Sequence, residues 1–355
     1  MAIGDVTAVL LFAAPLFAGA LEYEIQLSSS PEPFAIKVSE CFLQFTEEKL
    51  KLTRLPVDVD QPDWTDGPPV HNATSVRDYW IDEYKWIDVQ ADLNTRFHQY
   101  TVNISPGPDC TYCEDVPLHF VHHRSNRSDA IPLLFLHGWP GSFIEVGNII
   151  AGLTSPADLS VPAFHIVAPS LPGYAFSPAP TKTGFGARAA AEAFNALMVA
   201  KLGYAKYVVQ GGDIGAFVLR FLAGNHPESV VSALSNLWIT PPTPGDKTRY
   251  YSNKSSPDEA FTIESYGKFE NFSSGYRLEM QTQPLQLGYG LTDSPIGLAM
   301  WIYNFMHTGV DKYVWTAKDI ITWTMMYWIP GPYSGERMYK ELVKVKPLRI
   351  VVHQR

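Results

Sequence analysis

Between residues 131 and 240, short apolar runs alternate with longer segments whose apolar residues recur at helical spacing. The runs are continuously apolar, which is typical of strands buried on both faces of a parallel sheet that helices cover. We therefore predict an α/β core with a mostly parallel sheet. Its strands are expected within 131–141, 163–174, 206–213 and 230–238, and its helices within 142–153, 184–203 and 214–227.

The segment before this core has a mixed pattern. We predict an amphipathic helix within 39–56 and a second helix within 75–97, with Ser75 as its N-cap. Residues 97–104 and 117–125 alternate between apolar and polar side chains, as strands do. The residues expected on the buried face of the first helix are Phe42, Phe45, Leu50 and Leu52.

The strand–helix alternation ends after the core. Residues 294–309 and 316–329 are predicted helices in an aromatic-rich segment, and such an insertion is typical of a lid over a pocket. Residues 346–352 are apolar again and are expected to return to the sheet. The predicted division is a signal peptide at 1–20, an N-terminal region at 32–125, the core at 130–240, a helical cap at 241–342 and an incomplete return to the core at 343–355.

The composition narrows the class of protein. The chain has 355 residues, of which 46% are hydrophobic and 18% charged, and this is sufficient for a large buried core. The net charge of −9 and the lack of a basic stripe argue against nucleic acid as a partner. Aromatic residues make up 13%, which favours an aromatic-lined apolar pocket.

The N-terminus carries an apolar run, residues 6–20, that ends in Ala-Gly-Ala. The run is short for a membrane span and Pro15 interrupts it, so we interpret it as a signal peptide. A buried helix or a membrane anchor is the alternative. Five glycosylation sequons favour the secretory pathway and a secreted protein. They begin at Asn72, Asn103, Asn126, Asn253 and Asn271.

The three cysteines are Cys41, Cys110 and Cys113. The spacing of the last two occurs in redox motifs and in half of a zinc site. However, no second Cys-x-x-Cys follows, and the surrounding segment is rich in turn residues rather than the start of a helix. We therefore predict a structural disulfide with one thiol left over, and no metal.

The candidate chemistry centres on "QGGDIGAF", residues 210–217, which joins a predicted strand to a predicted helix. Small residues on both sides of Asp213 fit a nucleophile elbow, a tight turn that exposes one reactive side chain. A carboxylate there attacks an sp³ carbon and forms an alkyl ester, so the substrate is an electrophile such as an epoxide or an alkyl halide. An N-cap role for Asp213 is the alternative.

The motif "HGWPG" ends the first predicted core strand. A turn at that position can present backbone N–H groups to an oxyanion, and the candidate donors are the N–H groups of Trp139 and Ile214. An ordinary strand-ending turn is the alternative. The other residues of the motif that we single out are His137, Gly138 and Pro140.

Together these motifs resemble those of the microsomal-type epoxide hydrolases of the α/β-hydrolase superfamily. The resemblance extends over residues 32–350 and includes "YWIDEYKWIDVQADLN", "LLFLHGWPGSF", "LPGYAFS", "VVQGGDIGA" and "RMYKE". It implies an α/β-hydrolase fold, whose mostly parallel sheet has helices on both faces. It also implies a helical cap insertion and an N-terminal extension of epoxide-hydrolase type.

The resemblance also implies roles for individual residues. Asp213 would attack an epoxide carbon, while Tyr276 in "SGYRLEMQ" and Tyr339 in "RMYKE" would bind the epoxide oxygen and protonate it. Water would then hydrolyse the ester to give a vicinal diol, an activity associated with detoxification. The implied partners are a small apolar epoxide and water, with no cofactor and no metal.

In this family the hydrolytic step also uses a histidine base and an acid partner, which lie beyond the strand that corresponds to residues 346–352. We find neither before Arg355, so we expect a truncated chain that forms the ester and lacks this pair to release it. The other candidate groups are interpreted as structural, incidental or surface residues, namely His137, His226, His353, Glu145, Asp293 and Glu341.

Two other functions are compatible with part of the pattern. A haloalkane dehalogenase-like hydrolase also carries an Asp at the elbow, but a halide leaves without a proton, and the two tyrosines argue against it. A catalytically dead α/β-hydrolase-fold protein that binds apolar ligands is favoured by the missing base. The intact nucleophile, turn and tyrosines argue against that second alternative.

Overall fold

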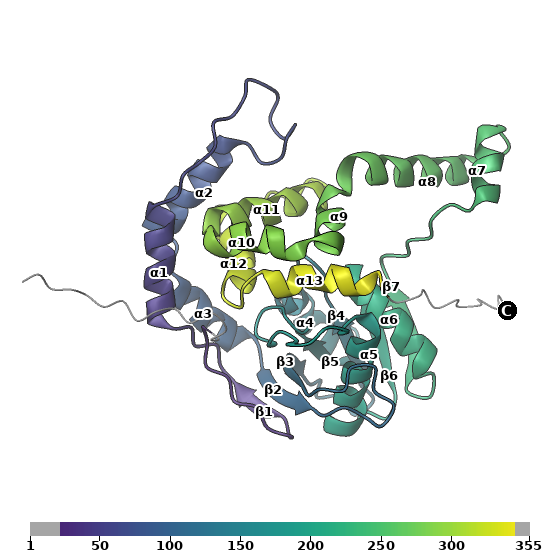
Figure 1. Cartoon of the computed structure of the whole chain (residues 1–355). Helices are drawn as coiled ribbons and strands as arrows, with labels where there is room; N and C mark the ends of the chain where they lie inside the picture. The colour runs from purple at the N-terminus through teal and green to yellow at the C-terminus, as the bar shows by residue number, and fades with distance from the viewer. Residues whose placement is uncertain (1–21, 345–355) are drawn as a thin grey trace, which may run out of the picture.

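The structure is a computed structural model that describes residues 22–344 (Figure 1). A sheet lies beneath a layer of helices, and the helices nearest the N-terminus lie along one side. The predicted signal peptide at 1–20, the predicted strand at 346–352 and His353 lie outside the described residues.

The described part of the chain contains a sheet of seven strands in the order β1-β2-β3-β5-β4-β6-β7. The strands β5, β4, β6 and β7 are parallel, whereas β1, β2 and β3 pair antiparallel at one side of the sheet. This confirms the predicted parallel core and the two predicted N-terminal strands. Their bounds are β1 (Glu32–Phe34), β2 (Gln99–Ile104), β3 (Val116–His123), β4 (Ile131–Leu136), β5 (Phe164–Pro169), β6 (Tyr207–Gly211) and β7 (Val230–Ser235).

The strand β7 departs from the expectation of burial on both faces. Val231 and Leu234 are 56% and 67% exposed, whereas Leu134 in β4 and Val167 in β5 are fully buried. The reason is position, because β7 is an edge strand among the described residues and pairs only with β6. Its apolar pattern is that of a strand inside the sheet, but the described elements leave most of it uncovered.

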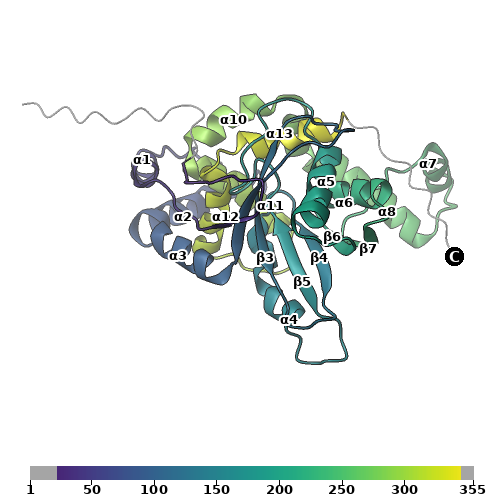
Figure 2. The same ribbon diagram turned by 90° about the horizontal axis from the view of Figure 1, so that it is seen from below.

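The core helices follow the predicted order. The first is mainly a 3-10 helix, and the second ends in a π-helical turn. Two of them, α5 and α6, pack against each other beside the parallel strands (Figure 2). The bounds are η1 (Phe143–Asn148), α4 (Ile150–Thr154), α5 (Ala187–Ala196), η2 (Leu197–Lys201) and α6 (Asp213–Asn225).

The prediction of a single second N-terminal helix is wrong. The segment forms two helices, α2 (Val70–Asp82) and α3 (Trp86–Arg96), and Ser75 lies inside α2, where its hydroxyl donates to a backbone carbonyl one turn earlier. Buried residues recur every three or four positions within each helix. The buried Trp80 and Trp86 are six positions apart, and that spacing would place them on different sides of one continuous helix.

The first predicted N-terminal helix is confirmed as α1 (Glu40–Lys51). Phe42 and Leu50 are buried, and Phe45 is partly buried against the core. Leu52 was expected on the same face but is 81% exposed. It is the C-cap residue, so the chain leaves the helix before Leu52 can reach the buried side.

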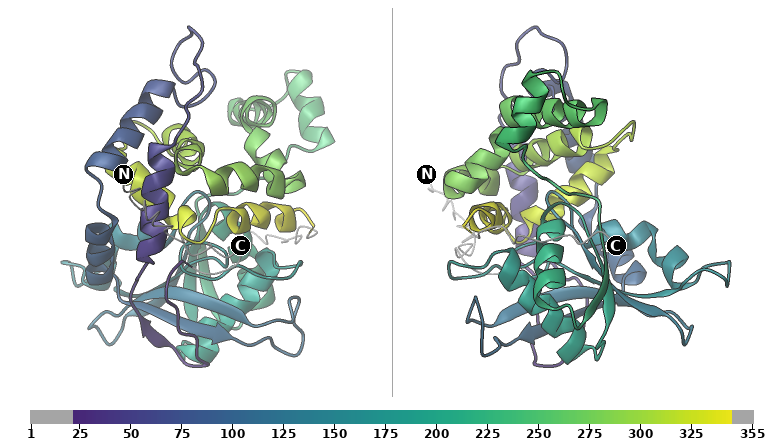
Figure 3. Two further views of the ribbon diagram at one scale, coloured as in Figure 1. Left: turned by 60° about the vertical axis from the view of Figure 1, so that its left-hand side comes forward. Right: turned by 90° about the vertical axis from the view of Figure 1, so that its right-hand side faces the viewer.

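The segment after β7 consists of helices stacked above the sheet (Figure 3). Both predicted helices are confirmed as α11 and α12, while α7 and α8 project from the body and bury no residue. No helix within residues 22–344 is long and apolar enough to cross a membrane. The bounds are α7 (Pro244–Tyr251), α8 (Pro257–Lys268), η3 (Phe269–Ser273), α9 (Gly275–Thr282), α10 (Pro284–Asp293), α11 (Pro295–Thr308), α12 (Ala317–Trp328) and α13 (Tyr333–Leu342).

The cysteines behave as predicted. Cys110 and Cys113 form a disulfide in the connection between β2 and β3, with Cα atoms 5.3 Å apart. Cys41 is a free thiol at the surface. The bridge therefore closes a surface turn remote in sequence from the elbow.

Glycines bring α6 into direct contact with the sheet. A Cβ on Gly215, in the first turn of α6, would lie 2.5 Å from the carbonyl oxygen of Leu136 and 2.8 Å from that of His137. A Cβ on Gly211, at the end of β6, would lie 2.5 Å from the carbonyl oxygen of Gly215. These neighbours are backbone atoms that cannot rotate away, so the helix reaches this position only with glycine at both sites.

We expect Gly215→Ala to destabilise the fold by about 1–3 kcal/mol, because the added methyl group overpacks a backbone contact. The measurement is the midpoint of urea unfolding followed by far-UV circular dichroism. Gly267→Ala is the matched control, since a Cβ at Gly267 in α8 meets no atom within 4 Å. Equal midpoints for the Gly215 variant and the wild type would contradict this account of the packing.

Candidate active site

Asp213 lies at the turn from β6 to α6 with a backbone φ of 47°. This left-handed conformation is uncommon for residues other than glycine and is strained. The tight packing of Gly211 against Gly215 holds it in place. The N-cap alternative is wrong, because Gly212 occupies the N-cap position and Asp213 is the first residue of α6.

The turn "HGWPG" holds the carboxylate of Asp213. The N–H of Trp139 donates a hydrogen bond to Asp213 Oδ1 at 2.9 Å. A Cβ at Gly138 would lie 2.5 Å from the same oxygen, so glycine leaves the room that the carboxylate occupies. Burial raises the pKa of Asp213, and the N–H groups of Trp139 and Ile214 oppose this shift because they stabilise the ionised form.

His137 fixes the conformation of this turn. Its Nδ1 lies 3.0 Å from the carbonyl oxygen of Gly138, and its Nε2 lies 3.0 Å from the N–H of Leu171, which donates to it. Nδ1 therefore carries the proton. The ring is 2% exposed, and burial lowers the pKa of His137 to about 4. A neutral ring with both nitrogens engaged serves a structural role, as the sequence analysis expected.

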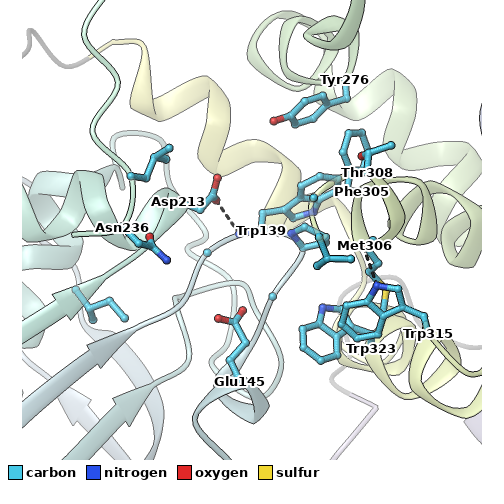
Figure 4. A pocket seen from close by; sticks show the side chains of 18 of the residues that line it. Trp139, Glu145, Asp213, Asn236, Tyr276, Phe305, Met306, Thr308, Trp315 and Trp323 are labelled. Carbon is cyan, nitrogen blue, oxygen red and sulfur yellow. Dashed lines mark hydrogen bonds between the residues drawn. The ribbon is translucent and has the colours of Figure 1, made fainter. Parts of the chain in front are cut away.

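A cavity of about 840 Å³ opens beside Asp213 (Figure 4). Among the described residues, Asp213 and Glu145 are the two charged side chains in its wall. Most of the remaining wall is apolar, and Pro140 forms part of it. The aromatic side chains of the wall are Phe135, Trp139, Phe269, Tyr276, Phe305, Trp315 and Trp323.

The two predicted tyrosines come from different helices and meet at Trp139. Tyr276 of α9 stacks on Trp139, with ring centroids 5.5 Å apart and the rings 16° from parallel. Tyr339 of α13 packs edge-on against both rings, at 6.1 Å from each. In Figure 4 the hydroxyl of Tyr276 points toward the carboxylate of Asp213. The structure thus brings both tyrosines close to the elbow, although more than 120 residues of sequence separate Asp213 from Tyr339.

The two phenols differ in exposure. Tyr276 lines the cavity, whereas Tyr339 is 6% exposed and does not belong to the cavity wall. Within residues 22–344 the hydroxyl of Tyr339 has no hydrogen-bond partner. Burial and the charge of Asp213 raise the pKa of Tyr276 to about 12 and that of Tyr339 well above its usual range. Both hydroxyls are therefore protonated at neutral pH and can donate.

Glu145, grouped above with the structural, incidental or surface residues, is a candidate that the sequence pattern did not identify. The short helix η1 begins after Ser142 and places Glu145 in its first turn. The side chain is exposed and lines the cavity. Desolvation by the surrounding protein and the charge of Asp213 raise the pKa of Glu145 to about 7. The only signal in the sequence is its place shortly after "HGWPG".

The remaining candidates lie away from Asp213. His226 follows the far end of α6, and Asp293 is an exposed partner of Lys49. Glu341 was expected at the surface but is 4% exposed, and it pairs with basic side chains one turn away on either side. Between residues 22 and 344 no group of three or more His, Cys, Asp or Glu side chains is placed to hold a metal ion.

Comparisons with known proteins agree with this architecture. Residues 31–146 match the model of the epoxide hydrolase N terminus, and residues 131–278 match that of the α/β-hydrolase fold. A putative epoxide hydrolase of Stigmatella aurantiaca is 36% identical over 318 residues, which are 87% of this chain and 69% of that protein.

Two solved structures are similar over a comparable length. The juvenile hormone epoxide hydrolase of the silkworm Bombyx mori is 29% identical with a TM-score of 0.78, covering 88% of this chain and 77% of that one. The epoxide hydrolase of Aspergillus niger is 30% identical with a TM-score of 0.75, covering 90% and 80%. The chain therefore belongs to the microsomal-type epoxide hydrolase family, within the α/β-hydrolase superfamily.

Proposed function

We propose that this protein hydrolyses an epoxide to a vicinal diol through an alkyl ester of Asp213. The observation that carries the proposal is the convergence of a carboxylate at an elbow, the N–H of Trp139 and two tyrosines beside one apolar cavity. The names of the three similar proteins, all epoxide hydrolases, support it. No cofactor enters the proposed reaction.

The first step opens the epoxide ring. An oxygen of Asp213 attacks one ring carbon, forming a carbon–oxygen bond while the bond from that carbon to the epoxide oxygen breaks. The epoxide oxygen takes a proton from Tyr276 or Tyr339, which leaves a tyrosinate. A phenol suits this role because it is a donor at neutral pH, and the raised pKa values keep it protonated before the substrate binds.

The second step hydrolyses the ester. Water attacks the carboxyl carbon of Asp213, and negative charge develops on the oxygen that the backbone N–H groups of Trp139 and Ile214 face. Donors fixed in advance at that position stabilise the tetrahedral intermediate. Loss of the diol then restores the carboxylate.

The substrate class follows from the cavity wall. An aromatic, largely apolar wall favours a small apolar epoxide, with water as the second substrate. The tyrosines favour an epoxide over a haloalkane, because the epoxide oxygen stays attached to the product and needs a proton. We also propose that residues 241–342 act as the cap and that the chain follows the secretory pathway, on the strength of its apolar leader and sequons.

A single turnover with styrene oxide in H₂¹⁸O tests the ester. We expect ¹⁸O to enter the carboxylate of Asp213 and the diol of this first turnover to remain unlabelled, because water attacks the carboxyl carbon. The measurement is the mass of the peptide that contains Asp213. Asp213→Asn, which keeps the shape and removes the charge, should lose on the order of 10⁴-fold in ester formation. A first-turnover diol that carries the label would contradict the proposal.

Removing one phenol should slow ring opening. We expect Tyr276→Phe and Tyr339→Phe each to lower the rate of ester formation by about 10²-fold, the usual cost of losing a positioned acid. The measurement is rapid quench followed by intact mass. Tyr289→Phe is the control, because Tyr289 is 72% exposed on α10. Rates equal to the wild type in both phenol variants would remove the tyrosines from the mechanism.

We expect the rate of ester formation to change in one direction only below neutral pH. Burial raises the pKa of Asp213, and only its ionised form attacks, so we expect the rate to fall as the pH drops through that raised pKa. The pKa of Tyr276, about 12, keeps this donor protonated and so predicts no matching loss between pH 7 and 9. A rate that rises on acidification would contradict the assignment.

A further inference from the structure

A second cavity, of about 480 Å³, lies at the end of the strands opposite the elbow. His123 of β3 pairs with Ile166 near the start of β5, whereas Asp213 follows the end of β6. Both β5 and β6 run parallel to β4, so these positions lie at opposite ends of the strands. Among the described residues the two cavities share no wall residue. The wall of the second cavity consists of Pro31, His98, Tyr100, Phe120, His122, Arg124, Lys201 and Leu202.

The pairing of β2 with β3 builds one side of this wall. Tyr100 lies directly opposite Phe120, with the two rings stacked and their centroids 5.6 Å apart. Beside them, the N–H of His122 donates to the carbonyl oxygen of His98 at 2.9 Å. Side chains two residues apart along a strand point to the same face of a sheet. These four side chains therefore present two aromatic rings and two imidazoles to one cavity.

The cavity is positively charged, although the whole chain has a net charge of −9. Arg124, which follows β3, and Lys201, the last residue of η2, line it, and no acidic side chain of the described residues does. Within residues 22–344 neither cation forms an ion pair. The Lys201 ammonium donates to the carbonyl oxygen of Ser29 at 2.7 Å. A concave wall whose charges share one sign attracts an ion of the opposite sign.

Four histidines cluster at this cavity, and their hydrogen bonds decide which of them can take up a proton. His123 Nε2 accepts from the N–H of His98 at 3.1 Å, and His165 Nδ1 accepts from a backbone N–H at 3.1 Å. Each of these acceptors is an unprotonated nitrogen, so His123 and His165 are held neutral. His122 differs, because its Nε2 lies 3.0 Å from the hydroxyl oxygen of Tyr204, which can accept from a protonated ring.

The positive surroundings keep His122 neutral in the free protein. Burial lowers the pKa of His122 to about 4, and the charge of Arg124 adds to the shift together with the histidines at positions 165, 123 and 98. No negative group of the described residues opposes it. An anion in the cavity offsets the charge of Arg124 and so raises the pKa of His122. Anion binding is therefore coupled to proton uptake below neutral pH.

We propose that this cavity binds the tetrahedral oxyanion of a small organic phosphate or sulfate ester. The guanidinium of Arg124 can donate two parallel hydrogen bonds to such an oxyanion, and Lys201 adds a point charge. The cavity is larger than an inorganic oxyanion fills, so it has room for the carbon group of the ester. The wall residues that suit this carbon group are Pro31, Tyr100 and Leu202.

Isothermal titration calorimetry of the full chain with phenyl sulfate and phenyl phosphate tests the proposal. Arg124→Gln removes the guanidinium from the cavity. The matched control is Arg54→Gln, since Arg54 is an exposed arginine outside the wall. Benzyl alcohol is the uncharged control ligand. Far-UV circular dichroism checks that each variant is folded. Because the measurement involves no epoxide, its outcome is independent of the proposed function.

We expect the wild type and Arg54→Gln to bind at least one of the two esters, and Arg124→Gln to bind it about tenfold more weakly or worse. Binding of only one ester identifies which oxyanion the cavity accepts. Equal affinities in the wild type and a folded Arg124→Gln variant would overturn the proposal. The same holds for a wild type that binds neither ester, or that binds benzyl alcohol as tightly as the esters.

The affinity for phenyl sulfate should rise as the pH falls. This ligand stays fully ionised between pH 5.5 and 7.5, so the titrating group belongs to the protein. The complex holds its proton at a higher pH than the free protein does, and acidification therefore strengthens binding, by up to about tenfold over this range. Titrations in two buffers of different ionisation enthalpy measure the number of protons taken up.

His122→Gln removes the group that takes up the proton while leaving Arg124 in place. We expect this variant to bind phenyl sulfate with little proton uptake, whereas the control His71→Gln should behave as the wild type, because the side chain of His71 is 65% exposed. Proton uptake in His122→Gln equal to that of the wild type would contradict the role of His122. An affinity of the wild type that does not change with pH would contradict it as well.

Discussion

The contact on which the site depends is the one between the first turn of α6 and the ends of β4 and β6. Gly215 meets the carbonyl oxygens of Leu136 and His137 at distances that admit no Cβ, and Gly211 meets the backbone of Gly215. This packing forces the left-handed backbone of Asp213 and places its carboxylate against the N–H of Trp139. Strain at one residue is sustained because the surrounding backbone leaves it no other position.

The cavity then gives two carboxylates different surroundings. Asp213 is buried but receives backbone hydrogen bonds, whereas Glu145 faces the open cavity beside a negative neighbour. Aromatic side chains from η3, α9, α11 and α12 enclose the remaining space and keep it apolar. Asp213, Glu145 and Tyr276 therefore line one largely apolar cavity, with Tyr339 packed behind Tyr276 and Trp139.

Local patterns predicted most of the fold because they report short-range physics. Continuous apolar runs predicted β4 to β7, and helical spacing predicted α5, α6, α11 and α12. The errors arose where long-range contacts decide. One expected helix is two helices, because Trp80 and Trp86 are six positions apart and are both buried. The strand β7 has the sequence of an inner strand but lies at the edge of the described sheet.

The sequence by itself determined the elbow and the turn, because the glycines around Asp213 and within "HGWPG" are typical of tight turns. Its motifs also determined the family. Only the tertiary structure decided which distant residues join them. It set Tyr276 and Tyr339 around Trp139, made His137 a structural residue, and directed Glu145 into the cavity. A side chain such as Glu145 carries no local signal, because its pKa and its partners depend on atoms that lie far away along the chain and only the fold brings close.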